Sequence, residues 1–162
     1  MIELHPDARV SLLADLETSV RGTRTVVGAR SVIDAFVKFK PAGGSGDIII
    51  GEDCVINSGC VFYSGNGIRI GNSVAIAANC TLAPVNHEFR VRALPISAQG
   101  FRLSKGGIVI EDDVWIGANC VLLDGSILRR GCVIGASSLV RGEIPEYAIA
   151  AGNPLVVLDY RR

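Results

Sequence analysis

The feature that most constrains this chain is a repeat of six residues. Counting in steps of six from one residue of the second half gives an unbroken aliphatic series: Ile110, Ile116, Leu122, Leu128, Ile134 and Val140. Earlier series follow the same step, with a slip of two residues between them: Ile50, Ile56, Phe62, Ile68 and then Ile70, Ile76, Leu82. The first 40 residues keep the step more loosely, in two registers: Leu4, Val10, Leu16 and then Val27, Ile33, Phe39. The repeat predicts a fold built from many short, equivalent units.

A second position of the repeat is small. It lies four residues after the aliphatic position and includes every cysteine of the chain: Cys54, Cys60, Val74, Cys80, Val114, Cys120, Ser126, Cys132 and Ser138. Residues that tolerate a positive φ recur just before it: Asp53, Gly59, Gly65, Asn79, Asp113, Asn119, Gly125 and Gly131. We therefore predict short strands with one large and one small inward side chain per repeat, joined by tight corners.

Composition agrees with a β-rich domain and excludes several function classes. Of 162 residues, 49% are hydrophobic but only 6% aromatic, so the core is made of small and branched side chains. Sixteen basic residues balance sixteen acidic ones, which disfavours binding to nucleic acid or to an anionic membrane. No stretch approaches the roughly 18 uncharged residues that cross a bilayer, so we expect no membrane insertion.

The cysteines and the N-terminal residues indicate in which cellular compartment the protein is expected. Five cysteines without a CxxC pair argue against a disulfide framework or a zinc ribbon. The chain starts without a basic segment followed by an apolar run, so we expect no signal peptide and a cytoplasmic protein.

One long segment interrupts the repeat. Between Leu82 and Ile110 the six-residue step fails, and residues 83–107 form an insertion that carries His87 and several basic side chains. Long irregular segments inside a compact domain are usually functional or disordered. This insertion is therefore the first place to look for chemistry.

The chain resembles the hexapeptide-repeat acyltransferases, in particular the galactoside, maltose and xenobiotic O-acetyltransferase branch. The resemblance rests on segments spread over residues 50–154: 70–79, the loop with His87, 110–119, 134–140, 144–145 and 151–154. It implies an all-β fold, a left-handed parallel β-helix of one domain over residues 1–162. Residues 83–107 would be the extruded loop and residues 145–162 the C-terminal tail. It also implies a homotrimer, with sites between neighbouring copies.

The resemblance implies roles for particular residues. His87 would be the general base, which suits an imidazole at neutral pH, and the backbone amide of Ala118 would stabilise the oxyanion. The residues assigned to the acceptor are Asn57, Trp115 and Asn86. Those assigned to acetyl-CoA, the co-substrate, are Gly117, Ala118, Ala136 and Arg141. No metal is expected, and the buried small position makes the cysteines poor candidates for a nucleophile.

We therefore expect an acetyltransferase that moves an acetyl group from acetyl-CoA to a hydroxyl of a sugar or sugar nucleotide, in surface-polysaccharide synthesis. An amino-sugar N-acetyltransferase is the alternative that sequence does not separate from it. A non-catalytic β-helix that acts as an interaction module is a third possibility. A zinc-dependent carbonic anhydrase on the same helix needs three histidine ligands, and this chain has only His5 and His87.

Overall fold

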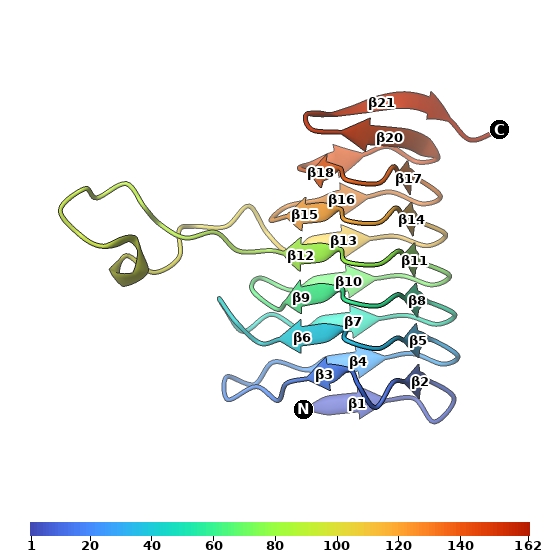
Figure 1. The fold of residues 1–162 in the computed structure, drawn as a ribbon, viewed down its shortest axis with the longest axis horizontal. Coiled ribbons are helices and arrows are strands. Elements are labelled where there is room, and N and C mark those ends of the chain that lie inside the picture. Colours follow the sequence, from blue (N-terminus) through green and yellow to red (C-terminus); the bar gives the residue numbers. More distant parts are fainter.

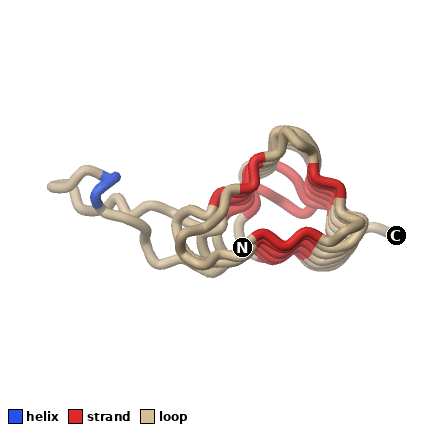
Figure 2. The backbone as a smooth tube through the Cα atoms, turned by 90° about the horizontal axis from the view of Figure 1, so that it is seen from below, coloured by secondary structure: helices blue, strands red, loops and turns tan.

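The chain folds into a parallel β-helix of triangular cross-section, which a computed structural model describes over all residues 1–162 (Figures 1 and 2). It visits three sheets in turn, and each strand pairs in parallel with the strands one turn below and one turn above. The helix is left-handed, as the resemblance implied, and so departs from the right-handed crossover usual for parallel strands.

Each sheet collects one strand from every turn. The first sheet contains β1 (Ile2–Leu4), β4 (Thr25–Val27), β7 (Ile48–Ile50), β10 (Ile68–Ile70), β13 (Ile108–Ile110), β16 (Ile127–Leu128) and β19 (Glu143–Ile144). The second contains β2 (Arg9–Val10), β5 (Val32–Ile33), β8 (Val55–Ile56), β11 (Ala75–Ile76), β14 (Trp115–Ile116), β17 (Val133–Ile134), β20 (Ala148–Gly152) and β21 (Leu155–Tyr160). The third contains β3 (Asp15–Leu16), β6 (Lys38–Lys40), β9 (Val61–Tyr63), β12 (Thr81–Ala83), β15 (Val121–Leu123) and β18 (Leu139–Val140).

Three edges join the sheets. We call the edge between the first and second sheets the first edge, that between the second and third the second edge, and that between the third and first the third edge. Strand pairing keeps equivalent residues in line along the axis, so that Ile76 lies over Ile56 and under Ile116. Every corner residue therefore stacks on the corresponding residue of the next turn.

The six-residue series forms the core, as predicted. All six aliphatic side chains of the series that starts at Ile110 are at most 1% exposed. In the third sheet two buried rings, Phe39 and Phe62, stack with centroids 5.0 Å apart. The narrow interior of the prism explains why the chain has many aliphatic and few aromatic residues.

The corner prediction is also confirmed. All eight residues that the sequence singled out have a positive φ: Asp53, Gly59, Gly65, Asn79, Asp113, Asn119, Gly125 and Gly131. A residue in this conformation bends the chain sharply within a few residues, which is what a tight corner requires.

The five cysteines are unpaired and buried at the small position. Four of the thiols, those of Cys54, Cys60, Cys80 and Cys120, also donate hydrogen bonds to backbone carbonyls of the next turn, for example Cys60 to Ala77 at 3.1 Å and Cys80 to Gly117 at 3.2 Å. The thiols therefore fill the corners and also link successive turns.

The longest excursions leave from the third edge. Residues 17–24 and 41–47 form enlarged corners there, and residues 84–107, which we call the arm, project sideways from the stack (Figure 1). The arm contains the one helical element, the 3₁₀ turn η1 (Ile96–Ala98). Near its tip, the Gln99 amide accepts from the Val91 N–H and donates to the carbonyls of Val91 and Leu94, each at 3.0 Å.

The C-terminal residues close the upper end of the prism. β20 continues the second sheet, and β21 turns back to pair with it in the antiparallel direction. The Arg161 guanidinium then donates to the carboxylate of Asp113 and to the carbonyl of Gly131, each at 2.9 Å, which fixes the end of the chain to the first edge. The structure contains no helix with the length and apolar character needed to span a membrane.

The core position of the repeat should dominate stability. Replacing Ile116, which is fully buried, by Ala should lower the free energy of unfolding by about 2–5 kcal/mol, because it leaves a cavity between packed turns. The matched control is Leu158→Ala in the same sheet, where the side chain is exposed, and this change should have little effect. Thermal unfolding followed by circular dichroism measures both, and equal shifts would contradict the core assignment.

The thiols should be inert in the folded protein. All five are buried, and burial raises the pKa of the Cys132 thiol to about 12 and also raises that of Cys54, so the reactive thiolate is scarce at these two positions near neutral pH. A hydrogen bond with Cys80 lowers the pKa of Cys60, so the protection of this thiol depends on its burial. A disulfide reagent such as dithiobis-nitrobenzoate should titrate none of the five thiols in buffer and all five in denaturant. Rapid reaction of a thiol in the native protein would contradict this assignment.

Candidate functional site

The base of the arm is a short two-stranded segment. The Glu88 N–H donates to the Gly100 carbonyl and the Arg102 N–H to the Asn86 carbonyl, each at 3.0 Å, and His87 lies opposite Phe101. Glu88 folds back on its own strand, where the N–H groups of Phe89 and Arg90 hold the pKa of its carboxyl below the usual range. The backbone around His87 is therefore ordered on both sides.

The His87 side chain faces solvent and packs on one ring. Its imidazole lies 4.8 Å from the Phe101 ring, centroid to centroid, at an interplanar angle of 37°. An imidazole supported on one face and exposed on the other is open to a ligand and to proton exchange. This is the geometry that a general base needs before its substrate arrives.

Two other predicted residues lie where the arm meets the prism. A cavity of about 300 Å³ at the third edge is lined by Asn86, Arg102, Lys105, Leu123, Asp124, Gly125, Arg141 and Gly142. It therefore brings Asn86, assigned to the acceptor, close to Arg141, assigned to the coenzyme. However, the Asn86 amide donates to the Asp124 carboxylate at 2.6 Å, so one of its hydrogen-bonding groups is already used within the chain.

The second edge holds Asn57 and Ala118. The Asn57 amide donates to the Ile76 carbonyl at 2.9 Å. The N–H of Ala118 has no acceptor within the chain and lies in a half-buried corner. The equivalent N–H groups in the other turns, those of Ser58, Ala78 and Ala136, also have no acceptor within the chain. The second edge thus presents a column of free donors, to which the predicted oxyanion donor belongs.

The other predicted residues surround this column. Gly117 is buried, and a Cβ there would approach the Ala136 backbone nitrogen at 2.6 Å, so the close stacking of these two turns requires glycine. Ala136 is exposed. Trp115 points outward from β14, as predicted, with 52% of its surface exposed between Ala75 and Val133.

The structure therefore divides the predicted residues between two edges. The third edge and the arm carry Asn86, His87 and Arg141, whereas the second edge and the adjoining strand carry Asn57, Trp115, Gly117, Ala118 and Ala136. The third sheet separates the two groups, and the arm extends away from the prism (Figure 2). One copy of the chain does not bring His87 and Ala118 together.

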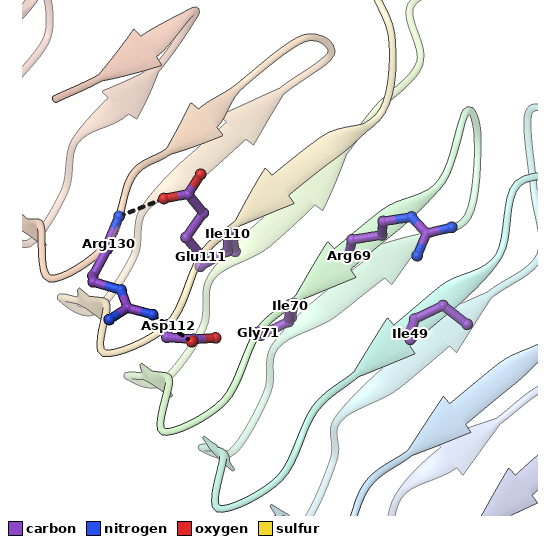
Figure 3. A pocket seen from close by; sticks show the side chains of 8 residues that line it. All are labelled: Ile49, Arg69, Ile70, Gly71, Ile110, Glu111, Asp112 and Arg130. Carbon is purple, nitrogen blue, oxygen red and sulfur yellow. Dashed lines mark hydrogen bonds and ion pairs between the residues drawn. The ribbon is translucent and has the colours of Figure 1, made fainter. Parts of the chain in front are cut away.

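A second cavity, of about 360 Å³, lies on the outer face of the first sheet and contains none of the predicted residues (Figure 3). Most of its charged groups are paired with one another: the Arg130 N–H donates to Glu111 at 2.8 Å, and its guanidinium to Asp112 at 3.1 Å. These bonds link successive turns along the first edge. We therefore assign this face to the stability of the stack.

Sequence reasoning missed two residues that contact the segment around His87. Phe101 supports its ring, and Asp124 binds Asn86 from a turn 38 residues later. In the sequence, Asp124-Gly125 looks like an ordinary corner pair. Only the folded structure shows that Asp124 also binds Asn86 of the arm.

Family comparisons match both parts of the repeat. Residues 107–142 match the family described as Bacterial transferase hexapeptide (six repeats), and residues 47–84 match the Hexapeptide repeat of succinyl-transferase.

Curated relatives match about half of the chain or less. A Mycobacterium tuberculosis protein named as an acetyltransferase is 39% identical over 83 residues, which is 51% of this chain and 27% of that protein. Escherichia coli WbbJ, named as a lipopolysaccharide biosynthesis O-acetyl transferase, is 34% identical over 88 residues, or 51% of this chain and 45% of WbbJ. A 2,3,4,5-tetrahydropyridine-2,6-dicarboxylate N-acetyltransferase of Staphylococcus aureus is 40% identical over 55 residues, or 34% of this chain and 23% of the enzyme. The chain thus matches less than half the length of each relative.

Solved structures match the whole fold. The N-acyltransferase AntD of Bacillus cereus, solved with dTDP and coenzyme A, superimposes with a TM-score of 0.81 at 18% identity, covering 99% of this chain and 84% of AntD. A hexapeptide-repeat acetyltransferase of Vibrio cholerae, solved with acetyl coenzyme A, gives a TM-score of 0.59 at 23% identity, covering 98% of this chain and 70% of that one. The family matches place residues 47–84 and 107–142 in hexapeptide-repeat families of bacterial transferases, and the whole chain has the fold of the solved hexapeptide-repeat acyltransferases.

Proposed function

We propose that the protein transfers an acetyl group from acetyl-CoA to a hydroxyl of a sugar or sugar nucleotide, in the cytoplasm and as a step of surface-polysaccharide synthesis. The observation that carries the proposal is the exposed His87 on an ordered arm, in a chain whose second edge presents free backbone donors. The names of the M. tuberculosis and E. coli relatives support acetyl transfer, and that of WbbJ supports a saccharide hydroxyl as acceptor.

His87 would accept the proton of the acceptor hydroxyl as its oxygen attacks the thioester carbon. The N–H of Ala118 would donate to the oxyanion that forms on the carbonyl oxygen, and a corner amide needs no reorganisation to do so. The proton on His87 would then pass to the departing thiolate. Because the buried cysteines are out of reach, direct transfer without an acyl-enzyme fits the structure.

The chain's groups fit a coenzyme A substrate along the second edge. The free N–H groups of Ala118 and Ala136 can donate to carbonyl oxygens of an extended ligand. Arg141 is exposed on the third edge, so it would offer a cation for a phosphate from the neighbouring copy. The Trp115 ring offers a flat apolar surface, and Asn57 a side-chain oxygen, on the acceptor side.

We further propose that the working unit is a homotrimer in which the arm of one copy reaches the second edge of its neighbour. This brings together His87 and Ala118, which a single copy keeps apart. The arm exposes an unusual number of apolar side chains for a solvated loop: Phe89, Val91, Leu94, Ile96, Phe101 and Leu103. The exposed Val55 and Trp115 of the second sheet offer a complementary apolar surface.

An N-acetyltransferase acting on an amino sugar is the second candidate. The S. aureus relative is named as an N-acetyltransferase, and an amine acceptor requires the same base and oxyanion donor. Thiol release from acetyl-CoA, measured with UDP- and dTDP-linked hydroxy sugars and amino sugars, separates the two. Release with none of them, together with no binding of acetyl-CoA by calorimetry, would favour the interaction module instead.

The base assignment is tested by His87→Ala. Turnover should fall by about 10²- to 10⁴-fold, because the acceptor oxygen would keep its proton during attack. The matched control is His5→Ala, which removes the other histidine, exposed in the first turn, and should not change turnover. Near-normal turnover of His87→Ala would sink the base assignment.

The shared site is tested by mixing two inactive variants. His87→Ala lacks the base, and Ala118→Asp places a carboxylate where the oxyanion forms. If each site combines the arm of one copy with the edge of the next, every mixed trimer regains one intact site, and an equal mixture should recover about a quarter of the wild-type activity. Co-expressed variants with distinct tags provide the mixture. A mixture as inactive as its two components would show that each site lies within one copy.

A further inference from the structure

The structure contains one carboxylate that binds both ends of the arm. Asp124 follows β15 at the third edge and is only 6% exposed. One carboxylate oxygen accepts from the Asn86 amide at 2.6 Å, on the outgoing side of the arm. The other accepts from the Lys105 N–H at 3.0 Å and the Ser104 hydroxyl at 3.4 Å, on the returning side.

The repeat itself does not require a charge at this corner. Strand register places Ser64, Pro84 and Gly142 at the equivalent position of the neighbouring turns, and none of them is charged. Burying a carboxylate is costly unless it is fully hydrogen-bonded, and here each donor comes from the arm. The only anionic group that lines this cavity is therefore used to hold the arm.

The contact also reaches the residue next to His87. Asn86 is fixed by its amide to Asp124 and by its carbonyl to the Arg102 N–H, so its position relative to the prism is set on both sides. His87 follows directly and has no contact of this kind of its own. Any shift at Asn86 therefore moves the imidazole.

We propose that Asp124 is the positioning residue of the site: it clamps the outgoing and returning ends of the arm to the third edge and so fixes the place of His87. This rests on the proposed function, in which His87 is the base. Asp124 does not touch the reacting atoms and acts only through the arm.

The test compares Asp124→Ala with Asp124→Asn. The alanine variant loses all three bonds, and kcat should fall by about 10- to 100-fold, the cost of misplacing a reacting group by roughly 1 Å, with little change in KM for acetyl-CoA. The asparagine variant should keep most of the activity. Its amide oxygen can accept from Lys105, and its NH₂ can donate to the Asn86 oxygen once that amide turns over. If Asp124→Asn were as slow as Asp124→Ala, charge and not clamping would be the cause.

The matched control is Asp47→Ala. Asp47 lies on the same edge and also accepts a backbone N–H from another turn, that of Arg24 at 2.8 Å, but it does not contact the arm. The Asp47→Ala variant should leave kcat unchanged. Trypsin should cleave after Arg102 and Lys105 faster in Asp124→Ala than in Asp47→Ala. Equal cleavage, or equal kcat, in the two variants would overturn the proposal.

A double variant separates positioning from general damage. If Asp124 acts only through His87, His87→Ala/Asp124→Ala should be no slower than His87→Ala alone in thiol release from acetyl-CoA with the best sugar nucleotide of the panel. Full additivity would overturn the proposal. Normal turnover of His87→Ala would refute the base assignment. Slow turnover of His87→Ala together with normal turnover of Asp124→Ala would refute only the positioning role of Asp124.

Discussion

The structure depends on strand hydrogen bonds that run along the axis of the prism. Each strand pairs only with the turns below and above, so every turn must follow the same path or lose its bonds on both sides. This is why the six-residue step is so strict in the strands. An insertion is tolerated only at a corner, where it can leave and return without breaking the ladder. The arm does so: Asn66 donates to the carbonyl of Pro84, the first residue of the arm, and Ile108, which directly follows the arm, donates to the Gly67 carbonyl.

The same constraint separates the chemical groups of one copy. Corners can carry free donors or extruded segments, but a rigid sheet lies between any two edges. Ala118 at the second edge and His87 beyond the third edge are therefore held apart by the third sheet. A flexible arm could fold back across that sheet, but the clamp at Asp124 and the pairing of Asn86 with Arg102 direct this one outward. Rigidity in the monomer thus favours an assembly that completes the site.

Much of the fold could be predicted from the sequence because every six-residue unit places its core and corner residues at the same positions. Ile116 and Asn119 could be assigned to core and corner from their place in the period alone. The role of Asn86 could not, because its partner Asp124 lies in a later turn and looks like any corner residue before Gly125. In the early turns the six-residue repeat is less regular in the sequence, because the enlarged corners at 17–24 and 41–47 shift the spacing between otherwise regular strands.

The column of free N–H groups on the second edge has one more consequence. The donors recur once per turn and are equivalent, because Ser58, Ala78, Ala118 and Ala136 offer the same contact. The column alone therefore does not define one position along the axis. A long ligand lying along such an edge could slide by one turn at no cost in hydrogen bonds. Its position must be set by a group that breaks the repeat. On the adjoining sheet that group is Trp115, a single large ring between Ala75 and Val133.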